Sequence, residues 1–95
     1  MTPQQAQLKI AADMRQLRID SGITQLELSQ KSGVALASLR KFERTGQISL
    51  TSLLKIAVIL QVMENIVMAL KPQENFKSID QMLNISKKKA RKRAR

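Results

Sequence analysis

Apolar residues between Pro3 and Pro72 recur every three or four positions, which is the spacing of residues on one face of an α-helix. Glycine, which often ends helices, separates these periodic segments at Gly22, Gly33 and Gly46. No segment alternates convincingly between apolar and polar residues, as a half-buried β-strand would. The pattern therefore predicts an all-α fold whose last core helix ends before Pro72.

Two of the expected helices begin with a sequence that caps a helix N-terminus. Thr2 is followed three residues later by Gln5, and Thr24 is followed three residues later by Glu27. In such a capping box the threonine hydroxyl accepts from a backbone N–H of the first turn, and the longer side chain accepts from the threonine N–H. We therefore expect helices to begin directly after both threonines, and Ser49 to cap a later helix.

The apolar stripes of these helices predict the hydrophobic core. Residues spaced to share one helix face are Ile10, Met14 and Leu17 in the first helix, Leu39 and Phe42 in the third, and Leu50, Leu53, Ala57 and Leu60 in the fourth. We expect these side chains to be buried against one another.

The fourth helix and the segment after it, which reads MENIVMAL, are apolar on more than one side. A helix of this kind is either central in the fold or covered by a second surface. One small core cannot bury all of this apolar surface, so we expect a homodimer interface here. Its expected residues are Val58, Ile59, Ile66 and Val67.

The helix expected between Gly33 and Gly46 carries a basic stripe. At about 100° per residue, the side opposite Leu39 and Phe42 is formed by Ala37, Arg40, Lys41 and Arg44. On these residues alone two interpretations are open. The stripe faces a polyanion, or it is an ordinary solvated surface.

Charge strengthens the first interpretation and adds a second basic region. Lys and Arg number 17 against 7 Asp and Glu, and seven of the basic residues occupy the last nine positions. These are Lys87, Lys88, Lys89, Arg91, Lys92, Arg93 and Arg95. Such a balance favours nucleic acid as the partner, with the tail lying along phosphates. An anionic membrane surface, an acidic patch on a partner protein and plain solvation of the tail are the alternatives.

Composition excludes several kinds of chemistry. The chain has no Cys and no His, which excludes thiol chemistry, His-based acid–base catalysis and the commonest zinc sites. We expect no enzyme activity, no metal and no cofactor, because no nucleophile–base pair or phosphate-binding loop occurs. The longest apolar run is too short for a membrane span, and the N-terminus lacks the features of a signal peptide. We therefore expect no membrane partner and a location in the cytoplasm.

The composition changes after Pro72, which divides the chain into a domain at 1–72, a segment at 73–86 and the basic tail at 87–95. The segment has a short amphipathic pattern and is expected to be a short helix. Its apolar residues are Phe76, Ile79, Met82 and Leu83. Two destinations are open: the segment docks on a partner protein or on the other subunit, or it folds back on its own domain.

Residues 22–60 read GITQLELSQKSGVALASLRKFERTGQISLTSLLKIAVIL and resemble the helix-turn-helix of the Cro and lambda-repressor class. The run Thr24–Ser29 matches the start of the first motif helix in that class, and Gly33 matches its turn glycine. Leu39 matches the buried aliphatic residue of its recognition helix, and Glu43 matches a glutamate near the end of that helix. The resemblance implies a five-helix lambda-repressor-like domain whose second motif helix enters the major groove of double-stranded operator DNA.

The resemblance also assigns roles to individual residues. It places Gln25 at a helix N-terminus in contact with a phosphate, and Lys41 or Arg40 against the O6 and N7 acceptors of guanine. Leu36 and Ala37 match positions that reach base edges, where they could touch a thymine methyl group or fill space. The full set of expected DNA contacts is Gln25, Leu36, Ala37, Ser38, Arg40, Lys41 and Arg44, with Ser38 and Arg44 on phosphates.

Other positions of the motif are expected to be structural. Arg18 and Glu43 match a family pair that ties the first helix to the third, and Ser29 is small where the two motif helices cross closely. Four positions depart from the family pattern, and two of them are Leu36 and Ala37, which are apolar where polar base-reading residues are common. Ala35 stands where a Ser or Thr cap is common, and Gln61 replaces the common glycine after the fourth helix.

These residues predict a sequence-specific DNA-binding regulator, a homodimeric repressor acting on a two-fold operator. The basic end that follows LQVMENIVMALKP also resembles small bacterial antitoxins encoded with HipA-type kinase toxins. The alternative function is therefore an interaction protein that binds and neutralises a toxin enzyme. Non-specific RNA or membrane binding by the tail alone is a third interpretation, which the helix-turn-helix disfavours as the main function.

Overall fold

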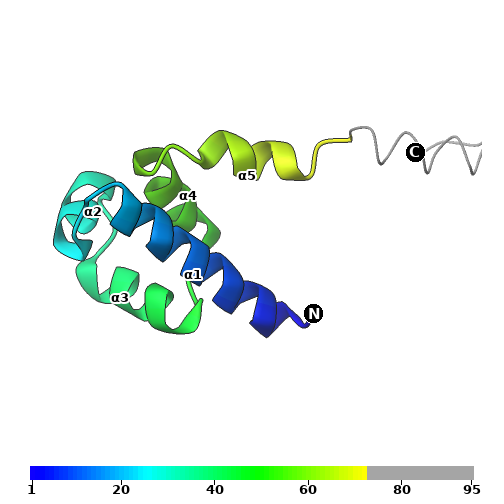
Figure 1. Cartoon of the computed structure of the whole chain (residues 1–95), viewed down its shortest axis with the longest axis horizontal. Coiled ribbons are helices and arrows are strands. Elements are labelled where there is room, and N and C mark those ends of the chain that lie inside the picture. Colours follow the sequence, from blue (N-terminus) through cyan, green and yellow to red (C-terminus); the bar gives the residue numbers. More distant parts are fainter. Residues whose placement is uncertain (73–95) are drawn as a thin grey trace, which may run out of the picture.

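The computed structural model describes residues 1–72, and these residues form five α-helices (Figure 1). The helices are α1 (Pro3–Asp20), α2 (Gln25–Ser32), α3 (Leu36–Thr45), α4 (Leu50–Ile59) and α5 (Met63–Ala69). Residues 1–72 contain no β-strand, so the predicted all-α fold class is confirmed. The predicted amphipathic segment 73–86 and basic tail 87–95 lie outside the described residues.

Three of the five helices begin at a side-chain cap. Thr2 and Thr24 complete the two expected capping boxes, with hydroxyl-to-backbone distances of 3.1 and 3.0 Å. Ser49 caps α4 in the same way, without the reciprocal bond. Ala35 precedes α3 and makes no side-chain cap bond, as its departure from the family pattern implied. Each cap satisfies an N–H that the first helical turn leaves without a partner.

Helices α1 to α4 surround a single core. Helix α1 packs along α3, α2 contacts both α3 and α4, and α5 contacts α4. In Figure 1, α5 leads away from the other four helices. The buried apolar residues are Ala11, Met14, Leu28, Val34, Leu39, Phe42, Ile56, Ala57 and Leu60. None of the described helices is long and apolar enough to cross a lipid bilayer.

The buried stripe of α1 contains Met14 as predicted, but its other two residues lie one position further along the chain than predicted. Ile10 is 46 % exposed, so its predicted burial is wrong. Ala11, Met14 and Arg18 form the buried stripe instead, and Leu17 packs half-buried against the core. Arg18 explains the difference, because a charged residue within the stripe hides the helical spacing from a count of apolar residues.

The stripe of α4 is also shorter than predicted. Leu53 is half-buried, Ala57 and Leu60 are buried, but Leu50 is 67 % exposed and its predicted burial is wrong. Leu50 is the first residue of α4, so it lies past the end of the packed core, and it borders the same hollow as Ile10. Sequence spacing places a residue on a helix face but does not say how far along that face the neighbouring helices reach.

The turn between α2 and α3 is closed by a glycine and a serine. Gly33 ends α2 with a φ of 80°, a left-handed conformation that glycine adopts without strain. Ser29 Oγ donates a hydrogen bond to the carbonyl oxygen of Val34 at 2.6 Å. Val34 is buried, so this bond fixes the start of α3 against the core and sets the direction in which α3 leaves the turn.

Two later turns also use the left-handed region. Gly46 ends α3 with a φ of 80°, and a Cβ atom there would lie 2.7 Å from the backbone of Gln7 in α1. Only glycine therefore allows α1 and the end of α3 to approach so closely. Gln61, between α4 and α5, has a φ of 62° although it carries a side chain. This backbone explains why glycine is common at the position, and why Gln61 is strained there.

Candidate nucleic-acid interface

Helix α3 is held by one face and presents the other to solvent. Leu39 and Phe42 are each 1 % exposed and form the anchor against the core. Arg40 and Lys41 lie between these anchors in the sequence, so they project from the helix on its other side, and both are exposed. The orientation of α3 therefore follows from where its two large apolar residues are buried.

The basic stripe predicted on α3 is exposed to solvent in the structure. Its exposed residues are Ala37, Ser38, Arg40, Lys41 and Arg44, with Leu36 half-buried at the edge. Within residues 1–72, Arg40, Lys41 and Arg44 take part in none of the ion pairs. Three positive charges on one helix face thus have no acidic partner among the described residues.

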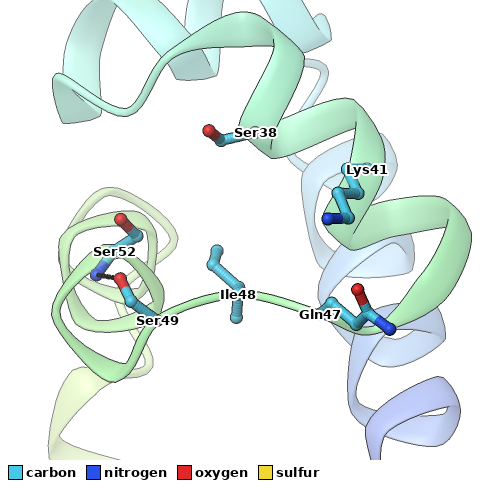
Figure 2. Close-up of a pocket in the computed structure, with 6 residues that line it drawn as sticks. All are labelled: Ser38, Lys41, Gln47, Ile48, Ser49 and Ser52. Atoms are coloured by element: carbon cyan, nitrogen blue, oxygen red, sulfur yellow. Dashed lines mark hydrogen bonds between the residues drawn. The ribbon is translucent and has the colours of Figure 1, made fainter.

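A hollow of about 370 Å³ separates α3 from the start of α4 (Figure 2). It is lined by Ser38, Lys41, Gln47, Ile48, Ser49 and Ser52. Figure 2 shows Ser38 and Lys41 on α3 facing Ser49 and Ser52 across this hollow. Only Ser38 and Lys41 were predicted as site residues. Gln47, Ile48, Ser49 and Ser52 were missed, because the sequence identified Ser49 as a cap but did not reveal which helix would face it.

The start of α4 gives this hollow a positive end. Ser49 Oγ accepts from the Ser52 backbone N–H at 3.1 Å, which leaves the hydroxyl hydrogen of Ser49 free to donate to a ligand. The N-terminus of a ten-residue helix favours negative charge, and Lys41 adds a full positive charge on the opposite side. The hollow can therefore accept an anionic oxygen, such as that of a phosphate.

A buried ion pair joins α1 to α3. Arg18 Nε lies 2.7 Å from Glu43 Oε2, and Arg18 Nη2 lies 3.1 Å from Glu43 Oε1. Arg18 Nη1 also donates to the carbonyl oxygen of Ile23 at 2.9 Å. The two side chains are 11 % and 5 % exposed. The structural pair that the family resemblance implied is therefore present, as a bidentate contact.

Gln25, the first residue of α2, is half-buried beside this pair. Its Nε2 donates to Glu43 Oε1 at 2.8 Å. The side-chain amide has two hydrogens, so one remains for a further acceptor. The predicted phosphate contact of Gln25 stays a prediction, and the structure adds that Glu43 fixes the position of its amide.

The predicted dimer residues divide into two kinds. Val58 and Val67 are 51 % and 60 % exposed, whereas Ile59 and Ile66 are half-buried and pack against the core. The other predicted site residues, in the segment Phe76–Leu83 and the tail, lie outside the described residues. Among residues 1–72, no cluster of acidic side chains is arranged to hold a metal ion.

Comparison with known proteins agrees with this geometry. The model of the Helix-turn-helix family matches residues 14–62, about half of the chain, which run from the middle of α1 past the end of α4. No curated protein and no solved structure gives a significant match. The family is one of DNA-binding, non-enzymatic domains. The chain therefore belongs to the helix-turn-helix family of the Cro and lambda-repressor type, a family of DNA-binding regulators of transcription.

Proposed function

We propose that the chain is a sequence-specific transcriptional repressor that binds a two-fold operator as a homodimer. The observation that carries this proposal is the exposed face of α3. Arg40, Lys41 and Arg44 project from a helix whose other side is locked into the core by Leu39 and Phe42. A helix that is anchored on one side and exposes a basic face on the other fits the major groove, which is about 12 Å wide and admits one α-helix.

Base recognition would come from the middle of α3. Arg40 or Lys41 can donate to the O6 and N7 acceptors of guanine, which is the commonest specific contact in the major groove. Ala37 and Leu36 carry no polar side-chain atoms, so they can only contact thymine methyl groups or fill space. We therefore expect the operator half-site to contain at least one essential guanine flanked by positions of weaker preference.

Phosphate contacts would hold α3 in register. Gln25 lies at the start of α2, and Ser49 and Ser52 lie at the start of α4, each beside a helix N-terminus. Ser38 and Arg44 complete this set at the edges of α3. Such contacts fix the position and orientation of the protein but carry no sequence information.

The homodimer would form through α4 and α5. Val58 and Val67 expose apolar surface, and Ile59 and Ile66 lie beside them, partly covered by the core. In a two-fold dimer the two α3 helices would lie about 34 Å apart, one turn of DNA. A repressor of this kind would act at the nucleoid, in the cytoplasm.

The test uses a duplex selected from a randomised pool by the wild-type chain, and a scrambled duplex of equal composition. Replacing Arg40 and Lys41 together with Ala should remove the preference for the selected duplex, a loss of about 1–3 kcal/mol per base contact. The control replaces Lys9 and Lys71, two exposed lysines on α1 and beyond α5, and removes the same charge. If the Arg40 and Lys41 variant keeps the full preference, with unchanged circular dichroism, α3 does not read the operator.

A second candidate function is that of an antitoxin, favoured by the amphipathic pattern of Phe76, Ile79, Met82 and Leu83 and by the basic end of the chain. In that case the segment would dock on a toxin enzyme, with a HipA-type kinase as the expected partner. Replacing Phe76 and Met82 with Ser would then abolish rescue of cells that express the toxin, while binding to the selected duplex stays unchanged. Full rescue by this variant would exclude the segment from toxin binding.

A further inference from the structure

Two arginines, Arg15 and Arg18, lie beside the buried carboxylate of Glu43. Arg18 binds both of its oxygens, at 2.7 and 3.1 Å, and Gln25 donates to Oε1 at 2.8 Å. The Glu43 side chain is 5 % exposed, so water has little access to it. Three donors on two oxygens satisfy this carboxylate, and its charge is neutralised by Arg18.

Arg15 is the surplus arginine of this cluster. Its Nε lies 4.0 Å from Glu43 Oε1, too far for a hydrogen bond, and its side chain is 56 % exposed. Arg15 makes no side-chain hydrogen bond to any of the described residues, although a guanidinium carries five N–H donors. Two arginines against one glutamate leave one uncompensated positive charge, and that charge is on the exposed side chain.

The surplus charge lies beside Gln25. Arg15 Nε and Gln25 Nε2 both approach the same oxygen of Glu43, so the two nitrogens are within about 7 Å of one another. A phosphate group that accepts a hydrogen bond of about 2.8 Å from each can bridge this gap with two of its oxygens. The 4.0 Å contact with Glu43 places the guanidinium near Gln25 and leaves its N–H donors unused among the described residues.

We propose that Arg15 is a DNA-contacting residue that binds a backbone phosphate together with Gln25. The inference rests on the proposed DNA-binding function and extends it from the helix-turn-helix to α1. Arg15 lies on α1 and not on α3, so it would bind the sugar–phosphate chain and not base edges. Its contribution is the same for every DNA sequence, because phosphate contacts do not distinguish bases.

The charge of Arg15 makes the proposal measurable, because each phosphate neutralised by a cation contributes about −0.9 to the slope of log affinity against log salt. Arg15→Ala should flatten the slope by about 0.9 and weaken binding to the selected and the scrambled duplex by the same factor, about tenfold. Arg15→Lys keeps the charge and should keep the slope. Gln25→Ala removes a neutral donor, so it should weaken binding with no change of slope.

The matched control is Lys9→Ala, which removes an exposed charge from α1 where it pairs with Asp13, away from Glu43. Its salt slope should equal that of the wild type. A wild-type slope for Arg15→Ala together with a lowered melting temperature would make Arg15 a structural partner of Glu43 and overturn the proposal. Weakened binding to the selected duplex alone would also overturn it, since it would indicate base recognition.

The two proposals fail in different ways. If the wild-type chain shows no preference for any selected duplex, the proposed function fails and this inference falls with it. If the wild type binds and the Arg40 and Lys41 variant loses preference, the proposed function stands. An unchanged slope for Arg15→Ala then excludes only the phosphate contact of α1.

Discussion

The α2–α3 unit and the α4–α5 unit are both pairs of short helices joined by a tight turn, but they are specified differently. In the first, Thr24 caps α2, Gly33 makes the left-handed turn, and Phe42 is buried. In the second, Gln61 occupies the left-handed position with a side chain, and no residue of α5 is buried. The first pair is therefore encoded locally, whereas the second depends more on what packs around it.

Burial shows the same contrast. The seven residues of α5 include none that is buried, and Leu70, which directly follows the helix, is 93 % exposed. Helices this short are marginal alone and gain their stability from packing. An apolar helix with little packing is consistent with a surface that is completed by a second copy of the chain, as the proposed homodimer requires. The α2–α3 unit would then read DNA, and the α4–α5 unit, whose second helix buries no residue, would join the subunits.

The largest expected effect is on the free energy of unfolding, and it is tested with one substitution in each unit. Phe42→Ala should lower the free energy of unfolding by about 3–5 kcal/mol, because it leaves a cavity in the core. Val67→Ala should change it by less than about 0.5 kcal/mol in dilute solution, because Val67 is 60 % exposed. Urea denaturation followed by circular dichroism measures both. If both variants lose the same free energy of unfolding, the two units do not differ in how firmly they are packed.

Protein concentration sharpens this comparison. If α5 forms the dimer, the effect of Val67→Ala should grow with concentration, since dimerisation stabilises the folded chain by mass action. If Val67→Ala has no effect on the free energy of unfolding at any concentration, Val67 is not part of a dimer interface.

The next effect concerns the two left-handed positions. Gln61→Gly should stabilise the chain by about 1 kcal/mol, because glycine adopts this backbone without strain. Gly33→Ala should destabilise it by a similar amount, although no atom lies within 4 Å of the added Cβ, because only the backbone is strained. Melting temperatures of the two variants should therefore move in opposite directions. A lower melting temperature for Gln61→Gly would mean that Gln61 makes contacts that outweigh its strain.

Much of the fold could be predicted because its signals are local. A threonine with a glutamine or glutamate three residues later defines the start of α1 and of α2, and the motif pattern gave the pair of Arg18 with Glu43. The basic face of α3 followed from the spacing of its two anchors, Leu39 and Phe42. In each case the partners are close in sequence or belong to the spacing pattern of a known motif.

What could not be predicted depends on how elements meet. Ile10 and Leu50 have core spacing but border a hollow, because the neighbouring helices do not cover them. Ser52 lines the hollow opposite Lys41 only because α4 starts beside α3. Gln25 and Glu43 are 18 positions apart, and neither residue type by itself predicts their hydrogen bond.

The smallest expected effect is a pH dependence of the melting temperature, which only one of the two capping boxes should contribute to. Hydrogen bonds from Thr24 to the Glu27 carboxylate hold the pKa of Glu27 below its ordinary value of 4.5. The backbone N–H of Thr24 has the larger effect and its hydroxyl the smaller. A depressed pKa means that the folded chain binds the proton less readily than the unfolded chain. The contribution of this box to the free energy of unfolding is therefore complete above the ordinary pKa and is lost as the pH falls through the lower pKa of the folded chain.

The box at Thr2 uses Gln5, which does not titrate, so of the two capping boxes only the one at the start of α2 should respond to pH. Melting temperatures measured from neutral to acidic pH should fall less for Glu27→Gln than for the wild type, because glutamine keeps the box without the charge. Parallel curves for the two proteins would show that Glu27 gains nothing from its charge, and that the start of α2 is as insensitive to acid as the start of α1.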